Sequence, residues 1–176
     1  MRRAAQLQEK SIALIGLMGA GKSTIGRRLA KRLALPFADA DADIEAAAGL
    51  SVAEIFERFG EAHFRDGERR VIARLVEGPV QVIATGGGAF MDDKTRALLL
   101  ARCTVVWLDG DIATLAERAG RRGRRPLLDG EDPAALLRRL AMLRNPIYAQ
   151  AHLTIRSDAA THERTVDRIV QALAAR

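Results

Sequence analysis

The chain has 176 residues, of which 48% are apolar and 28% charged, and these proportions fit one soluble globular domain. Its single cysteine, Cys103, excludes an intramolecular disulfide, and no apolar stretch is long enough to span a membrane, so we expect a cytoplasmic protein in which Cys103 is an inert core thiol. The net charge of +6 allows nucleic acid or small anions as ligands, but aromatic residues, which stack on bases, make up only 4%, and this favours small anions.

The first elements predicted along the chain are a strand over residues 12–15 and a helix over residues 22–35. Between them, Gly16 to Ser23 has the pattern G-x-x-x-x-G-K-[ST], which is typical of a phosphate-binding loop. Its glycines let several N–H groups converge on one phosphate, the Lys22 ammonium neutralises the outer phosphates, and the Ser23 hydroxyl can bind Mg²⁺. The strand before the loop and the helix after it favour this site over a plain glycine-rich turn.

A short strand at residues 37–39 leads into three acidic residues, Asp39, Asp41 and Asp43. On extended backbone, a spacing of two places the carboxylates of Asp39 and Asp41 on one side, where they can share a site. One carboxylate can then hold Mg²⁺ through water while the other accepts a proton from a substrate hydroxyl. The alternative role is helix capping, which we expect of Asp43, before a helix at residues 44–48.

The next stretch combines two helices, a strand and a run of glycines. The helices are predicted at residues 51–59, with Ser51 as N-cap, and at residues 61–76, and the strand at residues 80–84. Thr85-Gly86-Gly87-Gly88 follows this strand, and no packing reason requires three consecutive glycines. Although a glycine run by itself is more often a simple loop, its place after a buried strand indicates backbone that approaches a ligand closely.

The strand predicted at residues 104–108 ends before Asp109, and in many nucleotide-binding proteins an acid at this place holds Mg²⁺. The alternative is that Asp109 or Asp111 caps the helix predicted at residues 112–120. We favour capping, because Asp39 can fill the metal role.

Arginine is concentrated in the second half of the chain. The loop at residues 121–132 carries four, namely Arg121, Arg122, Arg124 and Arg125. This pattern indicates either a solvated run of charge or a mobile lid that places arginine over a transferred phosphate and excludes water. Arg65 and Arg144, each within a predicted helix, can meet an anionic substrate, although a single helical arginine more often lies on the surface.

The predicted elements alternate between strands and helices along the whole chain. After a helix at residues 134–150, which Pro146 should kink or end, come a strand at residues 152–155 and a closing helix at residues 161–174. We therefore expect one domain over residues 1–176, with residues 1–10 as a flexible extension. Its sheet should be parallel and doubly wound, with ligands at the carboxyl ends of the strands.

Six segments together resemble the shikimate kinase family, from about Ser11 to the C-terminal helix. They are GLMGAGKSTIGRRLA (16–30), FADADADIE (37–45), FRDGE (64–68), ATGGGA (84–89), RRPLL (124–128) and RNPIY (144–148). Outside the phosphate-binding loop each segment is weakly specific, but all six in this order are highly specific. The resemblance implies a three-layer α/β/α P-loop kinase with a central parallel sheet of five strands, a substrate-binding segment at about residues 39–70 and a lid at about residues 118–132.

The resemblance also implies transfer of the γ-phosphoryl group of ATP to the 3-hydroxyl of shikimate, with Mg²⁺ as cofactor. The ATP phosphates are then bound by consecutive residues of the loop and helix start, Gly19, Ala20, Gly21, Lys22, Ser23 and Thr24. Mg²⁺ binds the Ser23 hydroxyl, and Asp39 reaches it through water. Arg118 stacks on adenine, and Arg125 is the lid arginine that acts with Lys22 on the phosphates.

For the acceptor, the resemblance implies a second set of roles. Asp41 contacts the ring hydroxyls of shikimate and is the base, and Arg65 and Arg144 grip its carboxylate, as paired guanidinium hydrogen bonds allow. The ring and the γ-phosphate are lined by three glycines, Gly86, Gly87 and Gly88. We expect a monomer with shikimate and ATP as its partners, and with no nucleic-acid or membrane partner.

Two alternatives remain open from the sequence. A related P-loop kinase for another small hydroxy acid, such as gluconate, shares the phosphate-binding loop but gives no reason for Asp41, Arg65, the glycine run and Arg144 together. A basic nucleic-acid-binding protein that uses ATP as a switch is disfavoured by the scarcity of aromatic residues.

Overall fold

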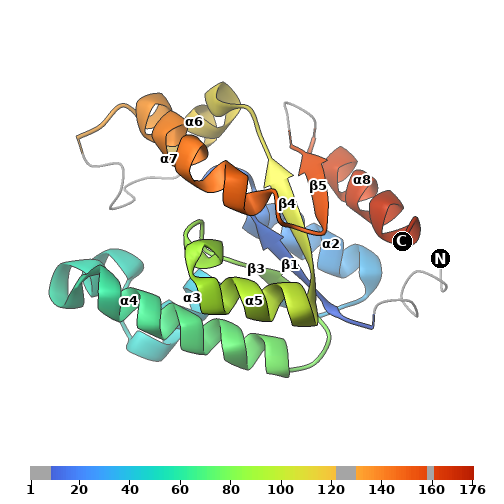
Figure 1. Cartoon of the computed structure of the whole chain (residues 1–176), viewed down its shortest axis with the longest axis horizontal. Helices are drawn as coiled ribbons and strands as arrows, with labels where there is room; N and C mark the ends of the chain where they lie inside the picture. The colour runs from blue at the N-terminus through green and yellow to red at the C-terminus, as the bar shows by residue number, and fades with distance from the viewer. Residues whose placement is uncertain (1–8, 122–129, 158–160) are drawn as a thin grey trace.

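Five parallel strands form the centre of the molecule, in the order β2-β3-β1-β4-β5 (Figure 1). The computed structural model describes residues 9–121, 130–157 and 161–176. The strands are β1 (Ser11–Ile15), β2 (Phe37–Asp39), β3 (Val82–Ala84), β4 (Cys103–Asp109) and β5 (Leu153–Arg156). Each observed pairing is parallel, which confirms the predicted five-stranded parallel sheet.

Helices cover both faces of this sheet. They are α2 (Lys22–Leu33), α3 (Ala40–Ala48), α4 (Val52–Glu77), α5 (Asp93–Arg102), α6 (Ile112–Arg121), α7 (Pro133–Tyr148) and α8 (His162–Ala174), with a short 3₁₀ helix, η1 (Ala89–Met91). Helix α2 packs against α8 on one face, and α4 packs against α5 on the other (Figure 1). The three-layer α/β/α architecture is therefore confirmed.

The central strand β1 is buried along its whole length. All five of its residues are buried, as expected of a strand that has helices on both faces. In the register of the sheet, Ala84 lies opposite both Leu14 and Asp39. The segments that follow β1, β2 and β3 therefore leave the sheet at the same edge, where ligands bind in open α/β folds.

Helix α4 is bent rather than straight. It begins with the predicted capping box, in which the Ser51 hydroxyl accepts from the Glu54 N–H and the Glu54 carboxylate accepts from the Ser51 N–H. Gly60 then interrupts the helix with φ 81°, a left-handed conformation that glycine adopts without steric cost. The two helices predicted on either side of residue 60 are therefore present, joined at this bend.

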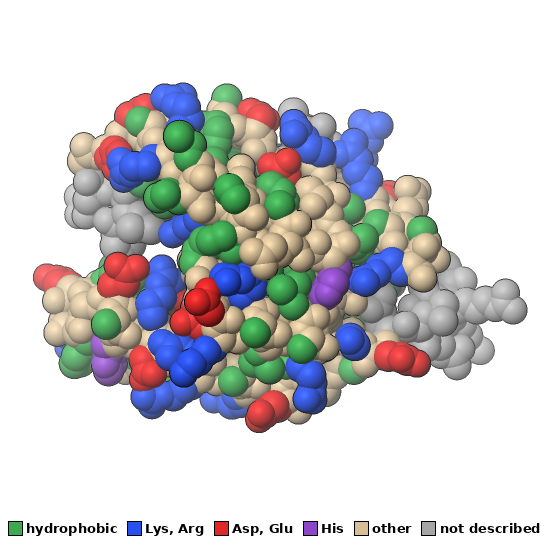
Figure 2. Space-filling view, viewed as in Figure 1, with side chains coloured by type: hydrophobic (Ala, Val, Ile, Leu, Met, Phe, Trp, Pro, Cys, Tyr) green, Lys and Arg blue, Asp and Glu red, His purple; other side chains and the backbone are tan. Residues whose placement is uncertain are grey.

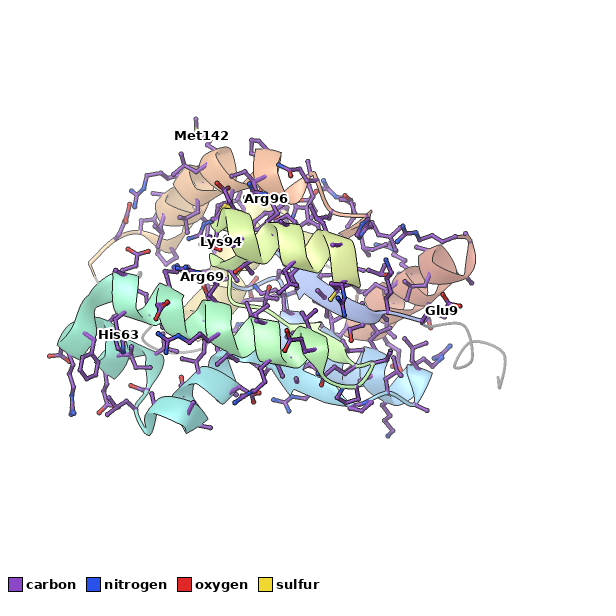
Figure 3. All side chains as sticks on the ribbon, turned by 60° about the horizontal axis from the view of Figure 1, so that its bottom comes forward. Glu9, His63, Arg69, Lys94, Arg96 and Met142 are labelled. Carbon is purple, nitrogen blue, oxygen red and sulfur yellow. The ribbon has the colours of Figure 1, made fainter. Side chains whose placement is uncertain are left out.

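Helix α4 is also tied to its neighbour α5. Arg69, which Figure 3 shows on α4, has its Nε 3.5 Å from Oδ2 of Asp92. The Asp92 carboxylate accepts from the Thr95 N–H at the start of α5. Cys103, predicted to be an inert core thiol, is buried, and burial raises the pKa of its thiol to about 11. This prediction is confirmed.

Two observations bear on possible partners. Among the described residues, no helix has the length and apolar character that crossing a membrane requires. On the face seen in Figure 2, Lys and Arg side chains are interspersed with Asp and Glu side chains. That mixture differs from the continuous basic face that nucleic-acid binding favours.

Candidate active site at the carboxyl ends of β1, β2 and β3

The loop from Gly16 to Ser23 has the backbone of an anion site. Gly21 is the N-cap of α2, with φ 85° and no side-chain cap, so the first N–H groups of this helix can point at a ligand. Gly19 also has a positive φ, 81°, and a Cβ at this position would overlap the Leu115 carbonyl oxygen. Glycine is therefore required here both by conformation and by space.

Lys22 and Ser23 face the space in front of this loop. The Lys22 ammonium donates to the carbonyl oxygens of Gly16, at 2.7 Å, and Leu17, at 3.0 Å. The Ser23 hydroxyl donates to Oδ2 of Asp39 at 2.5 Å. A small cavity of about 40 Å³ is lined by these side chains and the nearby backbone, namely Gly19, Gly21, Lys22, Ser23, Asp39, Asp41, Thr85, Gly86 and Gly87. We call it the phosphate cavity.

Asp39 and Asp41 both line the phosphate cavity, but not because they share one side of an extended strand, as the sequence suggested. The expectation that Asp43 caps the helix is wrong: Asp39 is the N-cap of α3, and its carboxylate accepts from the N–H groups of Asp41, at 3.1 Å, and Ala42, at 3.3 Å. Because α3 begins at Ala40, Asp41 lies in its first turn and not on extended backbone. Asp43 instead lies 3.5 Å from Arg74.

A larger pocket of about 310 Å³ adjoins the phosphate cavity, and we call it the acceptor pocket. It brings together all the residues predicted for the acceptor, namely Asp41, Arg65, Gly86, Gly87, Gly88 and Arg144. They come from α3, α4, α7 and the loop after β3. Apolar walls are added by Met18, Val52, Phe56 and Phe64. The pocket thus combines two guanidinium groups and three acidic side chains, those of Asp41, Glu45 and Glu68, with apolar surface.

The three consecutive glycines have a packing reason that the sequence did not reveal. A Cβ at Gly86 would lie 2.9 Å from Oδ1 of Asp41, and one at Gly87 would lie 3.2 Å from Nη1 of Arg144. A Cβ at Gly88 would overlap the guanidinium of Arg65. Each glycine therefore leaves room for a different charged side chain of the acceptor pocket, which any larger residue would displace.

Other predicted site residues lie elsewhere. Arg118 is half-buried on α6 and lines neither cavity, and Arg125 lies outside the described residues. Ala20 is buried, and its carbonyl oxygen accepts from the Ser157 hydroxyl at 3.3 Å. Thr24 lies in the first turn of α2 without lining the phosphate cavity. Among the described residues, the structure therefore brings together all the acceptor residues and four of the phosphate residues, whereas Arg118, assigned to adenine, lies outside both cavities.

Asp111 takes the capping role that we favoured at the end of β4. Its carboxylate accepts from the N–H of Thr114, at 3.0 Å, and from the Thr114 hydroxyl, at 2.5 Å. Asp109 lies 3.5 Å from Arg156. Within the described part of the chain, no cluster of three or more His, Cys, Asp or Glu side chains is arranged to hold a metal ion.

Comparison with known proteins decides the family. The model of the shikimate kinase family matches residues 18–174, which is most of the chain. The chain belongs to the shikimate kinase family. Shikimate kinase from Bradyrhizobium diazoefficiens is 53% identical over 169 residues, which cover 96% of this chain and 82% of that protein. The family resemblance seen in the sequence is therefore confirmed.

The fold leads to the same family. The solved shikimate kinase from Acinetobacter baumannii, in complex with shikimate, is similar with a TM-score of 0.93 and 36% identity, covering 98% of this chain and 97% of that one. The solved gluconokinase from Sinorhizobium meliloti reaches a TM-score of 0.60 at 20% identity, covering 94% of this chain and 92% of that one. At this identity the likeness to the gluconokinase shows a common fold alone, so shikimate kinase is favoured over the gluconate alternative.

Glu68 is a buried charged side chain of the acceptor pocket that sequence reasoning missed, as is the exposed Glu45. Glu68 is 2% exposed, and its Oε1 accepts from Nη1 of Arg65 at 2.7 Å. Its Oε2 is buried without a hydrogen-bond partner among the described residues. The signal that points to it is local: Arg65 and Glu68 are three residues apart on a helix, where oppositely charged side chains meet. Glu68 thus fixes the guanidinium that faces the pocket.

Replacing Glu68 with glutamine is expected to change how stability depends on pH. Burial raises the pKa of Glu68 above 4.5, and the opposing effect of Arg65 does not cancel it. The folded state therefore binds the proton of Glu68 more tightly than the unfolded state, so protonation of Glu68 stabilises the fold. This stabilisation is fully present below pH 4.5 and is lost as the pH rises through the pKa that Glu68 has in the folded state. In thermal unfolding measured from pH 4.5 upward, the unfolding temperature of the Glu68→Gln variant should increase relative to that of the wild type as the pH rises.

The exposed Glu57 on the same helix provides the control, and Glu57→Gln should leave the wild-type pH dependence unchanged. Parallel stability curves for Glu68→Gln and the wild type would contradict a raised pKa at Glu68.

Proposed function

We propose that the chain transfers the γ-phosphoryl group of ATP to the 3-hydroxyl of shikimate and releases ADP and shikimate 3-phosphate. The observation that carries this proposal is a shared wall, because Asp41, Gly86 and Gly87 line both the phosphate cavity and the acceptor pocket. A phosphate bound in one cavity and a hydroxyl bound in the other would meet at this wall, as in-line transfer requires.

On the nucleotide side, the loop amides and the Lys22 ammonium bind the ATP phosphates. A bound phosphate replaces the carbonyl oxygens of Gly16 and Leu17 as the partner of this ammonium, which then neutralises charge on the transferred group. Arg125 in the lid adds a second cation, and Arg118 stacks on adenine. The support for these last two roles is the family motif alone.

The residues at the phosphate cavity fit Mg²⁺. The Ser23 hydroxyl and the Asp39 carboxylate are 2.5 Å apart, and both are oxygen ligands of the kind that Mg²⁺ prefers. Ser23 would bind the ion directly, and Asp39 would bind it through water. When bound, Mg²⁺ neutralises charge that develops on the phosphates during transfer.

On the acceptor side, charge complementarity supports shikimate. Arg65 and Arg144 can form paired, charge-assisted hydrogen bonds with a carboxylate, while the apolar wall of the pocket contacts the ring. Asp41 then orients the 3-hydroxyl and accepts its proton. All of these residues come from one chain, and we expect a monomer that works in the cytoplasm.

An assay of ADP release tests the activity directly. With ATP and Mg²⁺ present, shikimate should stimulate ADP release, whereas gluconate, nucleoside monophosphates and single-stranded DNA should not. Identifying shikimate 3-phosphate as the product would establish the position of transfer. If shikimate gave no stimulation, or if gluconate gave more, the proposed substrate would be wrong.

Replacing Arg144 with alanine is expected to raise the KM for shikimate by about 10- to 100-fold, because a hydrogen bond to a charged group is lost. The KM for ATP should change little, since Arg144 lines only the acceptor pocket. Steady-state kinetics with each substrate varied in turn measures both effects. Arg138, exposed on the same helix, gives the control variant Arg138→Ala. An unchanged KM for shikimate would remove Arg144 from the carboxylate site.

A further inference from the structure

Tyr148 lies directly behind the acceptor pocket without lining it. It is the last residue of α7, and its side chain is fully buried. The ring packs against Phe90 and Trp107, with centroid distances of 6.4 Å and 5.8 Å. The hydroxyl donates to the carbonyl oxygen of Gly87, which is 61 residues away along the chain. A core tyrosine thus reaches the middle of the glycine run.

The same hydroxyl lies near a charged side chain of the pocket. The Arg144 guanidinium, one helical turn earlier on α7, lies beside Gly87, and its positive charge opposes the rise that burial causes in the pKa of the Tyr148 hydroxyl. A phenolic hydroxyl can donate one hydrogen bond and accept another, so it can serve Gly87 and Arg144 at once. Burial raises the pKa of Tyr148 to about 12, so the hydroxyl keeps its proton and remains a donor at neutral pH.

These contacts join parts of the site that need fixed geometry. Gly87 lies beside both Arg144 and the start of the phosphate-binding loop, since a Cβ on Gly87 would be 3.2 Å from Nη1 of Arg144 and 3.6 Å from the Gly16 carbonyl oxygen. Glycine backbone has the greatest conformational freedom of any residue, so a run of three needs external contacts to stay in place. A hydrogen bond from a rigid, buried ring supplies one.

We propose that Tyr148 is a positioning residue for the acceptor site, whose hydroxyl holds the Gly87 carbonyl and the Arg144 guanidinium in register with each other. The inference rests on the proposed function, because it gives Arg144 a role in binding the substrate carboxylate. A tyrosine that served only the core would need no hydrogen bond to the glycine run of the pocket. Here the hydroxyl donates to the Gly87 carbonyl oxygen, and Gly87 in turn lies beside the Arg144 guanidinium.

Replacing Tyr148 with phenylalanine keeps the ring and removes the hydroxyl. The KM for shikimate should rise by about 3- to 10-fold, the usual effect of one lost hydrogen bond, and the KM for ATP should stay within about twofold. The effect should be non-additive with Arg144→Ala, because once Arg144 is absent the hydroxyl has less to position. A purely structural role would lower the unfolding temperature without this selective change in KM.

Trp107→Phe is the matched control. It changes the packing against the same ring and leaves the Tyr148 hydroxyl in place. This variant should lose stability while keeping the wild-type KM for shikimate. If Tyr148→Phe does not fold, 4-fluorophenylalanine at position 148 fills the volume of the hydroxyl without a donor and should raise the KM in the same way.

The outcomes separate this inference from the function on which it rests. If Arg144→Ala leaves the KM for shikimate unchanged, the proposed carboxylate site is wrong. If Arg144→Ala raises that KM but neither variant at position 148 does, the site stands and the role of Tyr148 is overturned. Additive effects in the double variant would overturn it as well.

Discussion

Replacing Asp41 with asparagine is expected to lower kcat by about 10²- to 10⁴-fold, the usual contribution of general acid–base catalysis. The two side chains have the same shape, and the amide can still hydrogen-bond ring hydroxyls, so the KM for shikimate should change much less than kcat. What the amide cannot do is accept the proton of the attacking hydroxyl. Steady-state rates at saturating ATP, with shikimate varied, measure both quantities.

Asp43 offers a control on the same helix. Its carboxylate lies 3.5 Å from Arg74 and outside both cavities, so Asp43→Asn should keep kcat within about twofold of the wild type, as expected of a surface ion pair. If Asp41→Asn also kept kcat within that range, Asp41 would not be the base.

Replacing Lys22 with methionine is expected to lower kcat by about 10²- to 10³-fold, the loss typical for removing one preorganised group that stabilises charge in the transition state. Methionine keeps most of the length and apolar volume of the side chain, so the loss reports on the ammonium. The effect should appear in kcat even at saturating ATP and shikimate, because charge on the transferred phosphoryl group develops during the reaction.

Lys31 lies in the last turn of the same helix and is exposed, so Lys31→Met controls for the loss of one positive charge on α2. Thermal unfolding of the Lys22 variant should accompany the kinetics, because Lys22 also holds the carbonyl oxygens of Gly16 and Leu17. A variant that recovers the wild-type kcat once ATP is saturating would assign Lys22 to ground-state binding only.

Much of the fold can be predicted from the sequence because its signals are local. Parallel strands that are covered on both faces are short apolar runs, such as Ser11–Ile15, and the intervening segments have helical periodicity. The phosphate-binding loop is equally local, since its spacing fixes which residues meet at one helix start. Gly60 and the Ser51 capping box end and begin helices through their own backbone and side-chain chemistry.

The prediction for the acidic segment failed because two local preferences compete there. Asp39, Asp41 and Asp43 favour turns and helix starts, whereas Ala40 and Ala42 favour helix. The strand ends at Asp39, as predicted, but the helix begins at Ala40 and not at residue 44. Asp39 is therefore the cap, and Asp41 lies in the first helical turn.

Contacts between distant segments set the remaining features of the site. The link between Tyr148 and Gly87 joins residues far apart in the chain, and no spacing rule predicts it. The reason for three glycines is also tertiary, because each one faces a side chain from another element. Glu68 is intermediate: its pairing with Arg65 is local, but its burial follows from the packing of α4 in the fold.

The buried cysteine makes this chain convenient for labelling. Cys103 is 1% exposed, and burial raises its pKa to about 11. At pH 7 only about one thiol in 10⁴ would be a thiolate, the form that attacks maleimides and iodoacetamides. A second cysteine placed at an exposed position, such as Arg138, would therefore take up a fluorophore selectively. A fluorophore on α7 can thus be used during turnover without first removing the native thiol.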